Sequence, residues 1–202
     1  SVIYAFCTAR DVVAVEKAYE KAMAREVAAI CRHIPHEDLC IQWDVCHDMI
    51  VWDGQPQDQF PLVNASKEEI TSRFARICEA VPADVELGFH LCYGDFGGKH
   101  FFDPVTARHL VDVANAMAQS VQHDIAYIHL PVPAPRATEE FFAPMRDFRL
   151  APTTEIYLGL IHAADGVEGA RKRIALASQF VPRFGIATEC GFARARKQDL
   201  VR

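Results

Sequence analysis

One histidine and two cysteines are the residues of this sequence best suited to hold a metal ion. His90 and Cys92 are separated by one residue in the segment GFHLCY, and Cys190 follows much later in the segment ECGF. Alternate residues of a strand point the same way, so His90 and Cys92 could reach one ion from a strand end. Imidazole nitrogen and thiolate sulfur together suit zinc. The spacing alone leaves the alternative open, because free cysteines are usually small buried hydrophobic residues.

Six short runs rich in β-branched and aromatic residues would position these side chains. They cover residues 2–6, 39–45, 85–93, 125–132, 155–163 and 185–192. The intervening segments mostly have helical periodicity, and this alternation is typical of parallel strand-helix units. The runs are almost continuously apolar, as expected for strands that are covered on both faces.

Local signals place the helices between these runs. Asp11 is expected to cap a first helix, and Ser66 with Glu69 forms a capping box that opens a second. Asp103 and Pro104 are expected to start a third helix, because proline is tolerated in the first turn. A further helix is expected over residues 167–180. The proline-rich segment 131–152 is interpreted as loop with a short helix at 138–142.

Polar residues occur where the apolar runs end, and this indicates the fold class. They are Asp44, His90, Cys92, His129, His162, Glu189 and Cys190. In a (β/α)8 TIM barrel the carboxyl ends of all strands converge on one face. We therefore expect an α/β chain forming a single domain over residues 1–202. An open doubly wound sheet would have similar periodicity.

The chain is short for a complete barrel. It has 202 residues, whereas eight strand-helix units usually need about 250. We therefore expect it to contain roughly strands three to eight, with the first two units missing. Six such strands cannot close a barrel, so we expect the chain not to fold alone.

Five motifs in order resemble the catalytic C-terminal barrel of cobalamin-independent methionine synthase, a member of the superfamily that includes uroporphyrinogen decarboxylase. The motifs are IQWDVCHD, GFHLCYGDF, DIAYIH, EIYLGLIH and ECGF, and they span nearly the whole chain. The resemblance implies that His90, Cys92 and Cys190 bind a zinc ion that activates the thiol of homocysteine. Methyltetrahydrofolate would then be the methyl donor.

The fourth zinc ligand is where the sequence departs from that family. His129 stands where the family has glutamate. Imidazole is also a good zinc ligand, so His129 could complete the set. Equally, His129 could be a substrate-binding or acid-base group in a relative that has lost the metal.

Other candidate site residues follow from the same motifs. Asp44 matches the aspartate that binds the amino group of homocysteine, although Val45 replaces the family's next glutamate. His162 replaces an aspartate, and a histidine can move protons near neutral pH. The plainer alternatives are a carboxylate that anchors a loop at Asp44 and a hydrogen-bonded structural histidine at His162.

A glycine pair is flanked by two more candidates for substrate binding. Asp95 and His100 lie on either side of Gly97 and Gly98, whose backbone freedom would allow a loop to close on a ligand. Glu189, and with less support Arg136, are expected at the same mouth.

Composition excludes several classes of protein. The formal net charge is -6, and no cluster of Lys and Arg accompanies the aromatic residues, which argues against nucleic acid as a partner. No apolar run is long enough to span a membrane and no export signal is visible, so a cytoplasmic location is expected. The seven cysteines are expected to be reduced thiols. The expected partner is a small-molecule substrate, and a homo-oligomer is possible.

Three functions follow from these residues. The first is a zinc-dependent transferase that moves a methyl or other alkyl group to a thiol. The second is a metal-free lyase or decarboxylase in which His129, His162 and Asp44 act as acid-base or orienting groups. The third is a degenerate barrel that only binds or supports other molecules. Bound zinc would favour the first, and full activity without metal would favour the second.

Overall fold

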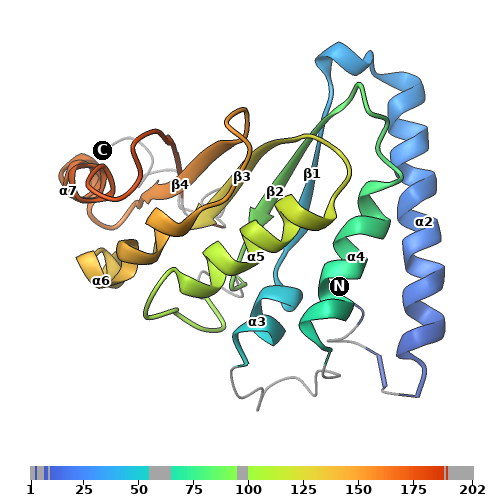
Figure 1. The fold of residues 1–202 in the computed structure, drawn as a ribbon, viewed down its shortest axis with the longest axis horizontal. Coiled ribbons are helices and arrows are strands. Elements are labelled where there is room, and N and C mark those ends of the chain that lie inside the picture. Colours follow the sequence, from blue (N-terminus) through green and yellow to red (C-terminus); the bar gives the residue numbers. More distant parts are fainter. Residues whose placement is uncertain are drawn as a thin grey trace.

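One parallel sheet of five strands organises the molecule (Figure 1). The computed structural model describes residues 3, 7, 8, 10–54, 65–94, 100–188 and 190. The strands are neighbours in chain order, and each pair is parallel. They are β1 (Cys40–Val45), β2 (Glu86–Leu91), β3 (Ile125–Pro131), β4 (Glu155–Ile161) and β5 (Gly185–Thr188).

Helices connect and flank these strands (Figure 1). The α-helices are α2 (Val12–His33), α3 (His47–Asp53), α4 (Lys67–Cys78), α5 (Arg108–Ser120), α6 (Glu139–Phe142) and α7 (Gly166–Ala177). Three 3-10 turns are η1 (His36–Asp38), η2 (Ala134–Arg136) and η3 (Ala143–Asp147). Right-handed crossovers between consecutive neighbouring strands bring such helices onto one face of the sheet. No helix in the described part of the chain combines the length and apolar character needed to cross a membrane.

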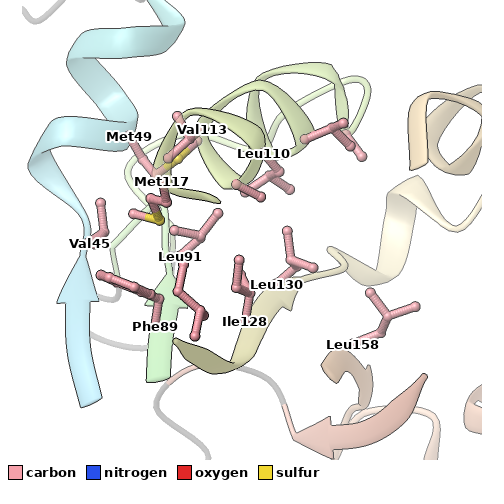
Figure 2. Close-up of a cluster of buried hydrophobic side chains, with 14 of the residues drawn as sticks. Val45, Met49, Phe89, Leu91, Leu110, Val113, Met117, Ile128, Leu130 and Leu158 are labelled. Atoms are coloured by element: carbon pink, nitrogen blue, oxygen red, sulfur yellow. The ribbon is translucent and has the colours of Figure 1, made fainter. Parts of the chain in front are cut away.

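Strand alternation gives the sheet two different faces. Phe89 and Leu91 of β2 and Ile128 and Leu130 of β3 are fully buried against α5, which contributes Leu110, Val113 and Met117 (Figure 2). The residues between them point to the opposite face, because side chains alternate along a strand. We call this opposite side the inner face. It carries the polar side chains of Gln42, Asp44, His90, Tyr127 and His129.

The α/β class with a parallel sheet flanked by helices is confirmed. Within the described residues the sheet is open, with β1 and β5 at its edges, and five strands are present instead of six. Of the strand expected over residues 2–6, only Ile3 is described. Ile3 is helical, and its carbonyl accepts a hydrogen bond from the Cys7 N–H at 2.9 Å. The prediction of a strand is therefore wrong at that position.

Helix starts were predicted with mixed success. The capping box is confirmed: Glu69 N donates to Ser66 Oγ at 3.1 Å, and Ser66 N donates to Glu69 Oε2 at 2.7 Å. Asp11 occupies the N-cap position of α2 but makes no capping hydrogen bond; its carboxylate accepts from the Thr8 hydroxyl instead.

The helix expected at Asp103 and Pro104 begins later, at Arg108. The residues before it are held by other contacts. Ala107 N donates to the Phe141 carbonyl at 3.0 Å, and the Thr106 hydroxyl accepts from Arg108 N at 3.0 Å. Helix α3, directly after β1, was not expected from the sequence.

Candidate metal centre

His90, Cys92 and Cys190 come together at the carboxyl end of the sheet. His90 and Cys92 lie at the end of β2, and Cys190 lies in the turn after β5. The Sγ atoms of Cys92 and Cys190 are 3.4 Å apart, and the ligand atoms of all three residues lie within 4.8 Å of one another. His90 and Cys92 are buried, and Cys190 is half-buried. The prediction that these three side chains converge is confirmed.

This contact joins strands that are not neighbours. Cys92 and Cys190 are 98 residues apart, and β3 and β4 lie between β2 and β5. Three strand spacings of about 4.8 Å would separate the ends of β2 and β5 by about 14 Å in a flat sheet. The sulfur contact therefore needs a curled sheet, a turn after β5 that reaches back over it, or both.

His129 lies directly beside His90. The two residues are register partners on β3 and β2, and their Nδ1 atoms are 2.9 Å apart. One ring must donate the shared proton and the other must accept it, so both rings cannot be fully protonated. Burial, followed by the charge of His90, lowers the pKa of His129 to about 4, although its interaction with the Thr188 backbone opposes this shift. His129 is thus neutral at neutral pH.

The second nitrogen of His129 lies close to Gly159. A Cβ atom on Gly159 would lie 3.5 Å from His129 Nε2 and 3.2 Å from the Thr188 carbonyl oxygen. His129 Nε2 therefore lies over β4 and beside the end of β5. His129 is not one of the three residues whose ligand atoms cluster.

A third thiol, from Cys46, belongs to this neighbourhood. Cys46 follows β1, and Cys92 N donates a hydrogen bond to the adjacent Val45 carbonyl at 2.9 Å. An interaction with the Cys92 thiol lowers the pKa of Cys46. The contact with Cys190 lowers the pKa of Cys92, but the Cys46 contact and burial outweigh it and raise that pKa to about 12.

Sequence reasoning overlooked Cys46, which it treated only as a replacement for the family's proline. The available signal was a sulfur two residues beyond Asp44, at a strand end. Its significance depends on the register that sets it beside Cys92.

Asp44 lies on the inner face, level with His90 along the strands. It is the register partner of His90, so the two side chains are neighbours. Gln42 Nε2 donates to Asp44 Oδ1 at 2.8 Å, and the Tyr127 hydroxyl donates to Gln42 Oε1 at 2.7 Å. The Tyr127 ring lies over Gly88, where a Cβ atom would approach it to 2.3 Å. This chain of hydrogen bonds orients the exposed carboxylate.

His162 has a different environment from the histidines of the cluster. It follows β4, is 4% exposed, and its Nε2 lies 2.9 Å from the Val132 carbonyl oxygen. It is not a member of the three-residue cluster. This tie to the backbone favours the plainer alternative of a structural histidine, and its acid-base role stays a prediction.

The remaining predicted residues are only partly described. His100 Nδ1 lies 2.8 Å from Asp103 Oδ1, so His100 is held within its own loop. Arg136 is exposed in η2. Asp95 and Glu189 lie outside the described residues.

A cavity of about 330 Å³ opens beside β1, between α2, α3 and α4. Its wall includes Trp43, Asp44 and Cys46. Arg73 also lines it and forms ion pairs with Glu16 at 2.7 Å and Asp48 at 2.6 Å. Asp44 and Cys46 are both among the residues that line this cavity.

Comparisons with protein-family models, with curated proteins and with solved structures each returned no match. The methionine synthase resemblance therefore rests on the motifs alone, and the geometry of the cluster carries the functional argument.

Proposed function

We propose that this protein is a zinc-dependent transferase that moves a methyl or other alkyl group to a small thiol. The single observation that carries the proposal is the convergence of His90, Cys92 and Cys190 from distant parts of the chain. The five ordered motifs support the same reading, with homocysteine or a related thiol as acceptor and a methyl folate as donor.

The fold we propose for this reaction is a (β/α)8 barrel. A doubly wound sheet reverses its strand order at a switch point, whereas the five described strands run in chain order. The 3.4 Å contact between sulfurs that follow β2 and β5 also supports a strongly curved sheet. Curvature of that kind makes the inner face the interior of a barrel wall.

The donor set fits zinc. One imidazole and two thiols supply nitrogen and sulfur ligands, and thiolates about 2.3 Å from one zinc ion lie roughly 4 Å apart, close to the 3.4 Å observed. Three protein ligands are typical of catalytic zinc sites, which keep one position for substrate. When bound, zinc would stabilise the substrate sulfur as a thiolate, which is the nucleophilic form.

His129 is best explained as the residue that orients His90. If His90 Nδ1–H donates to His129 Nδ1, the unprotonated Nε2 of His90 is left to present its lone pair to the centre. His129 Nε2–H would then lie near the end of β5, where it is buried and has no hydrogen-bond partner among the described residues. A second hydrogen bond of this kind commonly fixes the tautomer of a ligating histidine.

Asp44 is the group proposed to bind the amino end of the substrate. One carboxylate oxygen accepts a hydrogen bond from Gln42 on the inner face, and the carboxylate is exposed. An ammonium group held there would place an amino-thiol at the same level of the inner face as His90.

The His90–His129 pair also favours a second candidate, a metal-free lyase or decarboxylase. Two neighbouring imidazoles joined by a hydrogen bond can relay a proton between a substrate and the interior. In that case the three thiols would have no part in the reaction.

An assay of thiol methylation separates these functions. Purified protein is incubated with homocysteine and methyltetrahydrofolate, and the methylated thiol is followed by mass spectrometry with and without a zinc chelator. We expect product that the chelator abolishes, no product from Cys190→Ser, and normal product from the control Cys31→Ser in α2. Undiminished turnover of the Cys190→Ser variant or of the chelated protein would overturn the zinc-dependent reading.

A further inference from the structure

The sulfur of Cys92 has a hydrogen-bond donor of its own within the protein. The backbone N–H of Gly94 donates to Cys92 Sγ across 3.1 Å, and both residues are buried. The donor comes only two residues after the sulfur, so the chain must turn sharply between them. Whatever holds this turn also holds one donor atom of the candidate metal centre.

Gly94 is the residue that makes this turn possible. Its φ of 87° lies in the left-handed region, which glycine adopts at little cost and other residues avoid. A Cβ atom at this position would also run into the ring of Phe101. Backbone conformation and packing therefore both require glycine two residues after Cys92.

Tyr93 anchors the turn through contacts within the protein. The Tyr93 side chain is fully buried, and its hydroxyl donates to Asp53 Oδ2 at the end of α3 across 2.9 Å. The Tyr93 carbonyl accepts a hydrogen bond from Phe101 N at 2.9 Å, and its ring packs edge-on against Phe102 with centroids 5.7 Å apart. These contacts hold the Gly94 N–H in position without a bound metal or substrate.

A hydrogen-bond donor changes the chemistry of a thiolate sulfur. Because the hydrogen bond stabilises the charged form, it makes the thiolate less basic, and the nucleophilicity of a thiolate falls as its basicity falls. In the proposed reaction, the alkyl donor approaches a centre that contains the sulfurs of Cys92 and Cys190 as well as the substrate sulfur. Alkylation of either protein sulfur would remove a ligand and inactivate the centre.

We infer that Gly94 is a positioning residue of the metal centre. Its backbone N–H orients Cys92 Sγ and lowers the nucleophilicity of that sulfur, which directs the alkyl group to the substrate thiol. This inference rests on the proposed zinc site. It adds no ligand to His90, Cys92 and Cys190, so one position stays open for substrate.

Cadmium NMR tests this hydrogen bond in the wild-type protein. Cadmium binds soft thiolate ligands, and the nuclear spin of its spin-active isotope couples through the sulfur to a proton that is hydrogen-bonded to it. We expect a resolved coupling between the bound metal and the Gly94 amide proton. Coupling to the Cys92 β-protons without coupling to the Gly94 N–H would overturn the inference and leave the metal site intact. A protein that takes up neither cadmium nor zinc would instead overturn the proposed function.

Two glycine substitutions separate this role from backbone strain. Gly94→Ala is made in a Phe101→Ala background, where the new methyl group has no ring to meet. Relative to that background, we expect the thiolate-to-cobalt charge-transfer band of the cobalt-loaded protein to move to longer wavelength and the Kd for zinc to rise about 10–100-fold. Gly54→Ala is the matched control, because Gly54 also has a positive φ, of 73°, and its Cβ position has nothing within 4 Å among the described residues. The control should leave the band and the zinc affinity unchanged.

Alkylation measures the nucleophilicity of Cys92 itself. Methyl iodide should label Cys92 several-fold faster when Gly94→Ala is added to the zinc-loaded Phe101→Ala protein, as followed by mass spectrometry of its peptides. The inference is wrong if the Gly94→Ala protein folds, as judged by circular dichroism, and keeps the band, the zinc affinity and the labelling rate of its background. It is also wrong if Gly54→Ala shifts the band as much as Gly94→Ala does.

Discussion

Two polar clusters occupy the carboxyl end of the same sheet, and they differ in what their polar atoms contact. After β4, Arg173 donates to the Leu160 carbonyl at 2.8 Å and to Asp165 at 2.7 Å, and His162 is tied to the Val132 carbonyl. Around β2 the thiols and imidazoles face one another. Polar residues at a strand end therefore do not define a site by themselves. A candidate site needs donor atoms that converge on one another instead of on the backbone.

Replacing Arg173 with Met should produce the largest loss of stability. Arg173 is 3% exposed, and its loss would leave the Leu160 carbonyl without this donor and Asp165 without its cation. We expect the free energy of unfolding to fall by about 2–4 kcal/mol. The Asp165 side chain is 40% exposed, so water can solvate its unpaired carboxylate and limit the loss.

Urea unfolding measures this effect, and Arg171→Met is the matched control on the same helix. Arg171 forms an exposed ion pair with Glu168, so the control should change stability by less than about 1 kcal/mol. Equal effects of the two substitutions would contradict the structural role assigned to the cluster after β4.

Gly88→Ala tests how tightly the inner face is packed. The new Cβ would meet the Tyr127 ring at 2.3 Å, so the ring must move and its hydroxyl must leave Gln42. We expect a loss of about 1–3 kcal/mol, typical of overpacking. In a Tyr127→Leu background the same substitution should cost less, and a double-mutant cycle by urea unfolding checks this. Strict additivity of the two changes would argue against the contact.

Tyr127→Phe should affect substrate binding more than stability. It removes one hydroxyl from the chain that orients Asp44, a change of about 0.5–1.5 kcal/mol, equivalent to a rise in KM of roughly 2–10-fold. Tyr157→Phe is the control, because that hydroxyl donates to Glu155 instead. If both variants showed the same KM for the amino-thiol, Tyr127 would have no positioning role.

The pH dependence of stability should show a smaller contribution from the cluster after β4. The Arg173 hydrogen bond lowers the pKa of Asp165 below its ordinary value of 3.8. A lowered carboxyl pKa stabilises the fold above the unfolded pKa, and this stabilisation is lost as the pH falls through the folded value. The difference in stability between wild type and Asp165→Asn should therefore begin to shrink as the pH falls below about 4, and it should continue to shrink as the pH falls through the lowered pKa. A constant difference between them across that range would contradict the assignment.

The sequence predicted those parts of the molecule that depend on local pattern. The later strands and the Ser66 capping box follow from periodicity and capping chemistry. The common direction of parallel strands places His90, Cys92 and Cys190 at one end of the sheet, and their grouping as ligands was implied by the motif resemblance. Features that depend on contacts between strands were not predictable. Cys46 gains its meaning only from its register beside Cys92.

Tertiary contacts also overrode local signals. The Ala107 N–H is bonded to the Phe141 carbonyl, so the helix expected at Asp103 begins five residues later. His129 lies beside His90 and outside the three-residue cluster, so its role as a metal ligand stays a prediction. The 2.9 Å contact between the two rings is a feature that spacing in the sequence cannot reveal.

Zinc content tests the central claim most directly. It compares the loss of His90, in the cluster around β2, with the loss of His162, in the cluster after β4. Purified wild type, His90→Gln and His162→Gln would be analysed for metal by mass spectrometry after equal exposure to zinc, with circular dichroism to confirm folding. We predict about one zinc ion per chain in wild type and in His162→Gln, and little or none in His90→Gln. Equal zinc in the two variants, or none in the wild type, would contradict the assignment of the metal centre.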